Sequence, residues 1–558
     1  MKAFLAPLIQ QAIASAVTAA HLQPVDHPPS IALEIPKAVS HGDYSTNVAM
    51  TMARSQKAAP YDVARIIIDH IDDPDQLLSK VEVAGPGFIN FFITQKKWYE
   101  VLRAVHDEDK AYGTSQVGGG ERVQIEFVSA NPTGPLHVGH GRCAAVGETL
   151  AGILKAAGYE VQKEYYVNDS GRQIRTLGES VFVRCQQLVG KTVDLPKEGY
   201  QGDYIKDLAR TLLDTEGDRL MNIPEDQAVE LCARFASEQI LAEIREDLTS
   251  FGVSFDAWFS EQSLSESGAV ESVIADGKNN GTMYEHEGAL WFRTQDYGDE
   301  KDRVVVRANG LNTYFASDIA YHQDKFKRKF DRIIDVWGAD HHGYVSRVSA
   351  SVQALGIDAD RLNVLLIQLV NLLRDGKPVT MSTRAGEFVT LREVIDEVGR
   401  DAARFLFLLR HYESPLDFDL ELAKKQSNDN PVYYVQYVHA RISNILKKAA
   451  AQNYKRISWN EKFSDFINLP EEIELIKLMA QYPEVVSQSA LLMEPHRIPF
   501  YLKELAGAFH AYYHDRSKHQ VISDDAELTT ARLYLVAAIR MVIRNGLTLV
   551  GVSAPKRM

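Results

Sequence analysis

A strand, a chain break and a helix start follow one another within residues 123–140. Residues 123–128 alternate in polarity and are rich in β-forming side chains, which predicts a strand. The run Asn-Pro-Thr-Gly-Pro at 131–135 ends that strand, and the apolar residues beyond it recur with roughly helical spacing. His137 and His140 therefore fall in the first turn of a helix, on one face.

The start of this helix is suited to a bound anion. Its first backbone N–H groups are expected to be free, and the positive end of the helix dipole favours negative charge there. Gly139, between the two histidines, has no side chain, so a phosphate or a flat base can approach the backbone closely. We therefore predict a site that holds a triphosphate while its α phosphorus is attacked.

Length and composition indicate a globular protein of several domains. With 558 residues the chain is too long for one core and is expected to form about three or four domains. Hydrophobic residues make up 45% and charged residues 24%, as in packed soluble proteins. The sequence contains no run of about eighteen apolar residues, which a membrane span would require. Cys143, Cys185 and Cys232 form no Cys-x-x-Cys, which disfavours a disulfide framework or a zinc site and suits a reducing cytoplasm.

The net charge limits how the chain could bind RNA. Lysine and arginine total 61 and aspartate and glutamate 75, so the formal net charge is −14. A protein that coats nucleic acid through the phosphate backbone is expected to be basic. Any RNA contact is therefore expected at a local basic patch, and the candidates are 325–329, 424–425, 447–448 and 516–518.

The chain divides into four predicted segments. Residues 1–112 form an α+β unit that closes with two strands turning at a Gly-Pro-Gly, and a glycine-rich linker begins at residue 113. Residues 113–375 alternate strands and helices, which predicts a Rossmann-like, doubly wound parallel sheet. Residues 376–425 are expected to hold a loop and helices, and residues 426–558 are expected to be entirely helical.

The strands of the parallel sheet are placed at five positions. A helix-rich stretch from about 176 to 295 interrupts the alternation and is predicted to be an insertion between the two halves of the sheet. The strand candidates are about 123–128, 161–167, 303–307, 333–337 and 364–370.

His-Val-Gly-His at 137–140 resembles the HIGH motif of class I aminoacyl-tRNA synthetases. The longer stretch 127–140 resembles the form of that motif found in arginyl-tRNA synthetases of bacterial type. Two more segments resemble the same family: 41–47, in its amino-terminal domain, and 546–558, at its carboxyl terminus. The resemblance covers nearly the whole chain.

The resemblance implies an arginine–tRNA ligase. Such an enzyme activates L-arginine with ATP to arginyl-adenylate and pyrophosphate, and then esterifies the 3′ end of tRNA(Arg). His137 and His140 are then the catalytic donors to the phosphate oxygens, because the attacking carboxylate needs no base. The expected ATP-binding residues around them are Asn131, Pro132, Thr133, Gly134, Pro135, Leu136, Val138 and Gly139.

A second family element, the KMSKS loop, corresponds to residues 379–386. Both family lysines are threonines here, whereas Met381 and Ser382 match and are expected to bind ATP. Arg384 and Lys377 are the nearest cations, and Arg384 is predicted to act in place of the missing lysines.

The resemblance places the substrate arginine beside an acid and a phenol. Tyr314 and Asp318 are four residues apart, hence on one helix face, and match the family pair that holds the guanidinium group. Glu126 and Asn131 match positions that hold the amino group and backbone end, and His342 is expected to reach the same arginine.

Residues 336–344 contain Asp340, His341 and His342 in succession. A metal site is disfavoured there, because adjacent histidines point apart on a helix. The segment is instead expected to form the adenosine side of the pocket, with Gly338 and Asp340 binding ATP at the carboxyl end of a strand.

The remaining expectations concern tRNA and the setting of the protein. The resemblance implies that Asn90 contacts the D-loop of tRNA(Arg), and that Tyr433, Tyr437 and Arg441 bind the anticodon, which such side chains can do by stacking and edge hydrogen bonds. Mg²⁺ is expected to accompany ATP, with no metal held by the protein itself. A cytoplasmic monomer is expected.

Two other functions fit the His-x-x-His element alone. Small nucleotidylyltransferases use His-x-Gly-His, but the long helical tail and the Tyr314–Asp318 pair argue against them. A non-catalytic tRNA-binding relative would explain the missing loop lysines. Arginine-dependent ATP–pyrophosphate exchange, run with and without tRNA, discriminates among the three.

Overall fold

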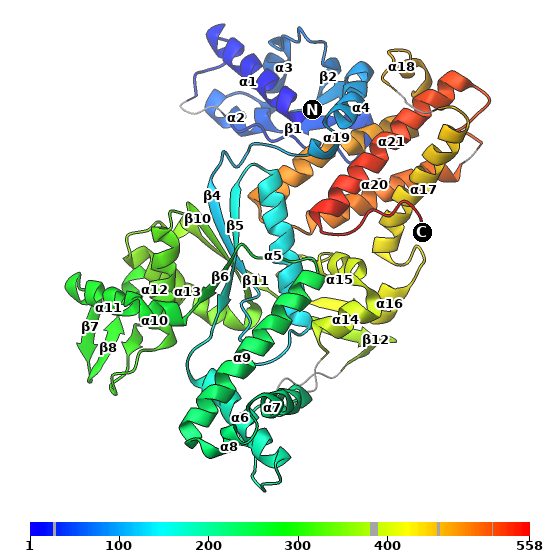
Figure 1. Ribbon diagram of the computed structural model, residues 1–558. Helices are drawn as coiled ribbons and strands as arrows, with labels where there is room; N and C mark the ends of the chain where they lie inside the picture. The colour runs from blue at the N-terminus through cyan, green and yellow to red at the C-terminus, as the bar shows by residue number, and fades with distance from the viewer. Residues whose placement is uncertain (26–28, 380–388, 455–457, 516) are drawn as a thin grey trace. The chain divides into compact units, whose positions relative to one another are not determined.

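The computed structural model describes residues 1–25, 29–379, 389–454, 458–515 and 517–558 (Figure 1). These residues form two compact units. The first unit contains 1–112, 444–482 and 508–542, and the second contains 113–443, 483–507 and 543–558. The long helices α17 (Pro431–Ala451), α19 (Pro470–Leu491), α20 (Arg497–His514) and α21 (Ala526–Leu549) contribute residues to both units.

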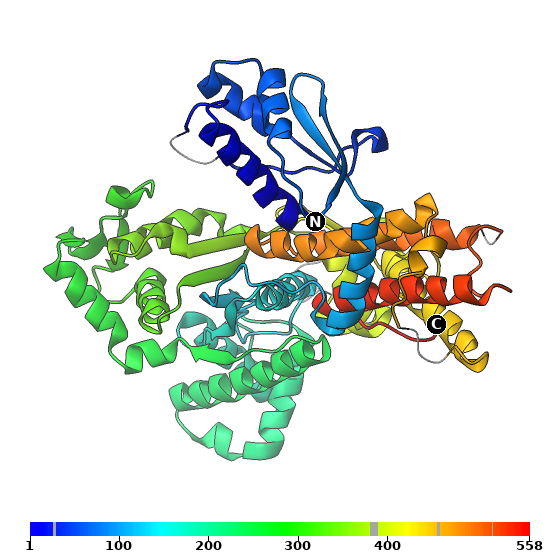
Figure 2. The same ribbon diagram turned by 90° about the horizontal axis from the view of Figure 1, so that it is seen from above.

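The first unit has an α+β part built on a three-stranded antiparallel sheet of order β1-β3-β2, drawn in blue in Figure 2. The predicted pair of strands that turns at Gly-Pro-Gly is confirmed as β2 and β3. Gly87 in that turn has φ +135°, and a Cβ there would lie 2.7 Å from Cβ of Pro60, so only glycine fits. The elements are α1 (Lys2–Thr18), β1 (Tyr44–Thr46), α2 (Val48–Gln56), α3 (Pro60–Asp69), β2 (Leu78–Ala84), β3 (Phe88–Ile93) and α4 (Gln95–Glu108).

The rest of the first unit is helical and includes α18 (Phe463–Phe466). Its helices are joined by a buried ion pair between Arg532 and Glu472, at 2.8 Å. The Tyr99 hydroxyl ties the α+β part to these helices by donating to the carbonyl of Ile467 at 2.6 Å.

The second unit is organised by a five-stranded parallel sheet of order β11-β10-β4-β5-β6. From β4 the chain winds outward through β5 and β6, then returns to β10 on the other side of β4. This confirms the predicted doubly wound fold, with its switch point between β4 and β10. The strands are β4 (Arg122–Phe127), β5 (Glu160–Val167), β6 (Ala257–Ser260), β10 (Arg332–Gly338) and β11 (Leu362–Ile367).

Helices cover both faces of this sheet. Side chains alternate along β4, so Phe127 and Glu126 face opposite sides. Helix α5 (Val138–Ala156) lies over Phe127, so close that a Cβ at Gly147 would lie 2.3 Å from the ring. Helix α12 (Tyr314–Lys327) lies over Glu126, which it meets through Lys325.

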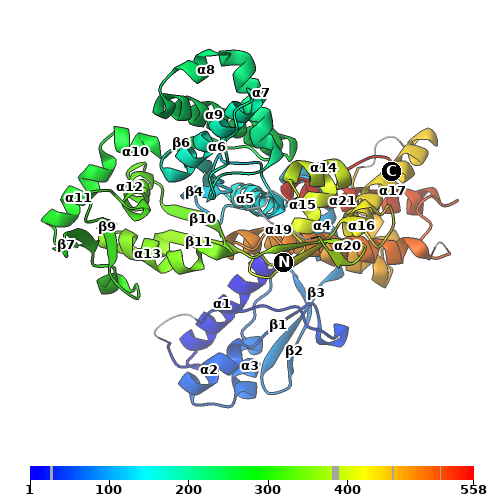
Figure 3. The same cartoon turned by 90° about the horizontal axis from the view of Figure 1, so that it is seen from below.

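The stretch between β5 and α12 carries most of the additional elements of the second unit. Figure 3 shows α6, α7, α8 and α9 as one group and α10 to α13 as another. Their bounds are α6 (Arg172–Leu188), α7 (Asp203–Glu216), α8 (Arg219–Asn222), α9 (Glu225–Ser250), α10 (Gln262–Glu266), α11 (Ala269–Asn279) and α13 (Val345–Ala354).

Two strand predictions in this region were wrong. The predicted strand 303–307 exists as β9 (Arg303–Val306), but it belongs to a separate antiparallel sheet with β7 (Met283–His286) and β8 (Ala289–Phe292). The fifth strand of the parallel sheet is β6, inside the stretch that was predicted to be a helix-rich insertion. β6 has only four residues, all partly exposed, so no burial periodicity marks it in the sequence.

A third small sheet, of order β13-β12-β14, follows the parallel one. Its strands are β12 (Val370–Arg374), β13 (Lys377–Pro378) and β14 (Leu416–Asp419), and the helices beside it are α14 (Leu391–Val398), α15 (Arg400–Phe407) and α16 (Leu420–Lys424). Within the described ranges, no helix is both long and apolar enough to cross a membrane.

Candidate functional site

The two histidines lie where β4 ends and α5 begins, at the switch point of the parallel sheet. His137 is the N-cap of α5 and His140 lies one turn later, and their rings stack with centroids 3.7 Å apart. Nδ1 of His137 accepts from the N–H groups of Gly139 and His140, at 3.1 and 3.4 Å. Nδ1 of His140 accepts from the N–H of His137 at 3.2 Å.

This capping pattern fixes where the ring protons are. A ring nitrogen that accepts a hydrogen bond carries no proton, so in both neutral rings the proton is on Nε2. Burial lowers the pKa of both imidazoles, that of His140 to about 3. The pair therefore offers two neutral N–H donors.

The expectation of free N–H groups at this helix start was wrong for two of them. The N–H groups of Gly139 and His140 are both occupied by the side chain of His137. A histidine N-cap satisfies these donors within the protein, so the imidazoles replace the backbone as the groups offered to an anion.

The residues that follow the KMSKS-like segment (379–386) are attached to the start of α5. Thr390 and His137 form a β-bridge, and the N–H of Leu391 donates to the carbonyl of Leu136 at 2.7 Å. Residues 380–388, which include Met381, Ser382 and Arg384, lie outside the described residues. Lys377 is exposed on β13.

Arg142 on α5 holds the segments that lead into β12 and β14. Its buried guanidinium donates to the carbonyls of Gln368 and His411, at 2.8 and 3.0 Å. These carbonyls precede β12 and β14, the strands beside the KMSKS-like segment. One turn of α5 therefore carries the histidine pair and also holds that small sheet in place.

The residues expected on the adenosine side begin where β10 ends. Gly338 is the last residue of β10, and Asp340 lies in the 3-10 helix Ala339–Tyr344 that follows. The carboxylate of Asp340 is exposed and acts on the imidazole of His137 by raising its pKa against the effect of burial. The carboxyl ends of β4 and β10 thus both contribute to the switch point, whereas His342 is exposed on the same 3-10 helix.

Helix α12 presents Tyr314 and Asp318 as expected, on one face. The phenol of Tyr314 is half exposed and close to Gly171, where a Cβ would lie 3.4 Å from the hydroxyl. The Asp318 carboxylate accepts a hydrogen bond from the Tyr344 hydroxyl. Burial raises the pKa of Asp318.

Glu261 was missed by the sequence analysis. It directly follows β6, is 6% exposed, and is hydrogen-bonded to Ser317 and Tyr166. Burial first, and then the charge of Asp318, raise the pKa of Glu261 to about 7. The signal for it was an acid at the carboxyl end of a parallel strand, but that strand was itself overlooked.

Glu126 and Asn131 are already hydrogen-bonded to neighbouring side chains. Glu126 accepts from the Ser129 hydroxyl at 2.9 Å and from Lys325 Nζ at 2.6 Å. Asn131 Nδ2 donates to Gln173 Oε1 at 2.6 Å, which links the loop after β4 to the first turn of α6. Lys325 is fully buried, so the expectation that 325–329 forms a basic surface patch was wrong for its first residue.

The residues that we expect to bind tRNA lie far in the sequence from the histidine pair. Asn90 lies in the middle of β3, is 2% exposed, and its Nδ2 has no hydrogen-bond partner among the described residues. On α17 the rings of Tyr433 and Tyr437 stack with centroids 6.1 Å apart, and Arg441 follows one turn later, partly buried.

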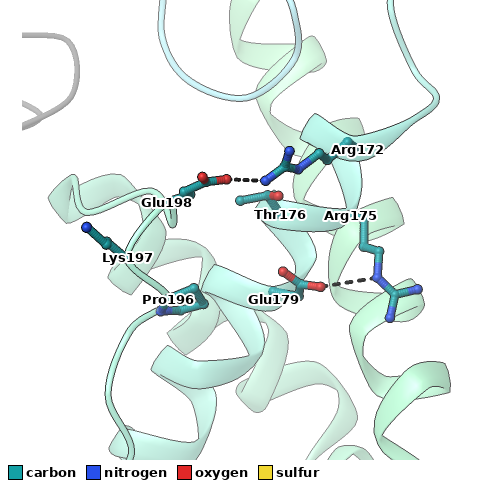
Figure 4. A pocket seen from close by; sticks show the side chains of 7 residues that line it. All are labelled: Arg172, Arg175, Thr176, Glu179, Pro196, Lys197 and Glu198. Carbon is teal, nitrogen blue, oxygen red and sulfur yellow. Dashed lines mark hydrogen bonds and ion pairs between the residues drawn. The ribbon is translucent and has the colours of Figure 1, made fainter. Parts of the chain in front are cut away.

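A cavity of about 420 Å³ lies along the first turns of α6 (Figure 4). Four of its charged side chains form two pairs, Arg172 with Glu198 and Arg175 with Glu179, and Lys197 also lines the cavity. None of the residues expected to bind ATP or arginine lines it.

Three protein families match consecutive parts of the chain. They are described as the arginyl tRNA synthetase N terminal domain over residues 5–93, the catalytic domain of class I (R) tRNA synthetases over 101–410, and the DALR anticodon binding domain over 435–558.

Curated relatives and solved structures agree with these matches. The arginine–tRNA ligases of Desulfosudis oleivorans and Syntrophotalea carbinolica are 58% and 54% identical over 532 and 530 residues, 95% of each chain. A putative arginyl-tRNA synthetase structure from Campylobacter jejuni has a TM-score of 0.74 at 33% identity, covering 84% of this chain and 100% of that one. The arginyl-tRNA synthetase of Thermus thermophilus shares the fold, with a TM-score of 0.77 at 23% identity over 99% of this chain and 100% of that one.

Proposed function

The chain belongs to the arginyl-tRNA synthetases, and on that premise we propose how its residues ligate arginine to tRNA. The protein is an aminoacyl-tRNA-forming ligase whose substrates are ATP, L-arginine and tRNA. The arginine carboxylate attacks the α phosphorus of ATP, which forms arginyl-adenylate and releases pyrophosphate. The 3′ end of tRNA(Arg) then attacks the adenylate carbonyl and releases AMP.

The stacked pair of neutral imidazoles is the observation that carries this proposal. Negative charge grows on the oxygens of the α phosphate during activation, and donors aimed at that charge lower the barrier. His137 and His140 hold their ring protons on Nε2, because both Nδ1 atoms accept from backbone N–H groups. The ATP then lies over residues 131–139, with Gly338 and Asp340 on its adenosine side.

Pyrophosphate exchange tests these roles. Arginine-dependent ATP–pyrophosphate exchange is expected in the presence of tRNA, and His140→Ala is expected to slow it about 10²–10³-fold. His137→Asn keeps a side-chain acceptor for the helix start but removes the ring donor, so a similar loss with a normal melting temperature is expected. Wild-type protein that supports no exchange with or without tRNA would contradict the ligase function, and unchanged rates in both variants would remove the histidines from it.

For the amino acid, we propose that Asp318 and Glu261 share the guanidinium group. Glu261 is buried directly after β6, Asp318 is partly buried on α12, and the charge of Asp318 helps to raise the pKa of Glu261. A planar five-donor fork can satisfy two carboxylates, whereas the single ammonium of lysine cannot do so in the same geometry. Tyr314, one turn before Asp318 on α12, is proposed to pack against the same guanidinium.

The α-ammonium group of the arginine is proposed to meet Glu126. The register of β4 places Glu126 at the end of the strand, one residue before Phe127. Asn131 contacts the backbone end of the substrate, and His342 on the 3-10 helix after β10 reaches it from the other side of the switch point.

The pyrophosphate end is proposed to be held by the loop that precedes Thr390. Arg384 replaces the missing lysines, with Met381 and Ser382 beside it, and Lys377 is the alternative cation. The β-bridge between Thr390 and His137 supports this, because it fixes one end of the loop next to the histidine pair. Mg²⁺ enters as the Mg²⁺ complex of ATP and screens the triphosphate charge.

The tRNA is proposed to span three further segments. Residues 1–112 contact its D-loop through Asn90, residues 376–425 its inner stem, and residues 426–558 its anticodon through Tyr433, Tyr437 and Arg441. Stacked tyrosines on α17 supply π-faces for unpaired bases. Asn90 is 2% exposed, so its unsatisfied Nδ2 would become a donor for a base edge only if tRNA binding exposes it. We further propose a monomer in the cytoplasm, with 113–375 as the catalytic domain.

A further inference from the structure

Three buried carboxylates form a row across the parallel sheet. Asp335 on β10, Glu126 on β4 and Glu164 on β5 are register partners, and each is less than a tenth exposed. Acids this close repel one another unless cations are set against them. Every basic side chain that meets the row among the described residues comes from α12 and the residue just after it.

Lys325 is the central cation of this row. Its Nζ lies 2.6 Å from Oε2 of Glu126 and 2.7 Å from Oδ1 of Asp335, and the side chain is fully buried. Burial alone would lower the pKa of Lys325, but the two carboxylates raise it, so the ammonium stays charged. Glu126 therefore has one oxygen fixed by Lys325 and the other by Ser129.

The contacts continue from Asp335 back to α12. Nε2 of His322 lies 2.9 Å from Oδ2 of Asp335, and Nδ1 of the same ring lies 2.8 Å from the backbone carbonyl of Asp318. An unbroken series of contacts thus runs from the Glu126 carboxylate through Lys325, Asp335 and His322 to the turn of α12 that carries Asp318.

The two ends of this series are the acids assigned to the two ends of the amino acid. We propose that Lys325 is a positioning residue for amino-acid selection: it holds Glu126 and, through Asp335 and His322, sets the distance between Glu126 and Asp318. The proposed function requires that distance to match the span from the α-ammonium to the guanidinium of arginine. The inference rests on the proposed roles of Glu126 and Asp318.

A purely structural role for Lys325 predicts a different behaviour. Removing one partner of a buried ion pair is strongly destabilising, whereas removing both partners is often nearly neutral. If Lys325 only neutralises Asp335, then Lys325→Met/Asp335→Asn should restore both the melting temperature and substrate binding. If Lys325 positions Glu126, the same double variant still leaves Glu126 without its cation, so the melting temperature recovers only in part and the arginine KM stays raised.

The experiment measures KM and kcat for arginine in aminoacylation at saturating ATP and tRNA. Lys325→Met and Lys325→Met/Asp335→Asn are both expected to raise the arginine KM about 10- to 100-fold, the range for loss of a hydrogen bond to a charged group, and to leave the ATP KM within about threefold. Lys325→Arg, which keeps the charge, is expected to recover part of the loss. Discrimination against homoarginine, one methylene longer, is expected to weaken in the first two variants.

Arg328→Met is the matched control, because Arg328 pairs with Glu164 in the same row at 2.9 Å and does not touch Glu126. It is expected to lower the melting temperature while leaving the arginine KM within about threefold. A double variant with normal melting temperature and normal arginine KM overturns the inference. So does an equal rise of KM in Arg328→Met.

Glu126→Gln separates this inference from the proposed function. A raised arginine KM in Glu126→Gln with a normal KM in the double variant overturns only the role of Lys325. A normal KM in Glu126→Gln overturns the role of Glu126, and the role of Lys325 falls with it.

Discussion

At the scale of single residues, the histidine pair uses its two ring nitrogens for different purposes. Nδ1 of each ring accepts from the backbone and stabilises the start of α5. Nε2 of each ring carries the proton and is the donor that we assign to the α phosphate. The structural contact thereby fixes the tautomer that the reaction needs.

The low pKa of His140 gives a prediction about acid stability. The unfolded chain binds a proton on this residue at about pH 6.5, whereas the folded protein does so only near pH 3. Its contribution to stability is therefore present above about pH 6.5 and is lost as the pH falls toward 3. Lowering the pH from 7.5 to 5 is expected to reduce the melting temperature of His140→Asn less than that of the wild type. Parallel melting curves for the two proteins over that interval would contradict the shift.

Glu261 gives a second prediction at this scale, for substrate binding. Its pKa of about 7 means that it is partly protonated at neutral pH, and the guanidinium needs the ionised form. The arginine KM of the wild type is therefore expected to fall about five- to tenfold from pH 6 to pH 8. Glu261→Gln is expected to have a higher KM that no longer varies over this range, measured as arginine-dependent pyrophosphate exchange. A retained pH dependence in that variant would assign the titration to another group.

At the scale of elements, α12 shows what the sequence could and could not predict. The i, i+4 spacing of Tyr314 and Asp318 predicts their shared face from local geometry alone. The sequence predicts a surface patch at the basic run that begins at Lys325, because nothing local shows that its partner is Glu126, 199 positions away in the chain. Local patterns predict faces of helices, but only the sheet register reveals which charges are buried together.

The same reasoning explains the other differences. The long strands of the parallel sheet were predicted because buried strands leave apolar runs, whereas β6 is short and partly exposed. Glu261 was missed with it. The capping role of His137 could not be predicted either, since helix propensities favour Ser, Thr, Asp or Asn at that position.

The start of α14 provides a prediction for one element. Thr390 accepts from the N–H of Glu393 at 3.1 Å, and the Glu393 carboxylate accepts from the N–H of Thr390 at 2.7 Å. Thr390→Ala should cost about 1 kcal/mol of stability. Because Thr390 also bridges His137, this change is expected to raise the ATP KM several-fold, measured by pyrophosphate exchange.

Asp419→Ala is the matched control for that variant. Asp419 caps α16 by accepting from the N–H groups of Glu421 and Leu422, at 2.9 and 3.2 Å. It should lower the melting temperature by a similar amount and leave the ATP KM unchanged. An equal change of the ATP KM in both variants would mean that general destabilisation, rather than the anchor at Thr390, is responsible.

At the scale of the whole molecule, the second unit gathers segments that are distant in the chain. The buried guanidinium of Arg404 donates to the carbonyls of Phe251, Gly252 and Val550, at 3.1, 3.2 and 3.0 Å. Gln436 and His439 on α17 contact the residues that follow Val550, at the carbonyls of Ser553 and Pro555. Residues 550–555 are thus held against α15 and α17.

The acidity of the molecule bears on how it binds tRNA. A formal net charge of −14 repels a polyanion, so attraction must come from a few local cations whose counterions are released on binding. For about three phosphate contacts, the tRNA KM in aminoacylation should rise about 10- to 100-fold between 50 and 200 mM KCl. The arginine KM, measured at saturating tRNA, should change less than about twofold, because the charges of the buried Glu261 and the partly buried Asp318 are poorly screened by salt. A tRNA KM that is independent of salt would mean that binding rests on stacking and base edges alone.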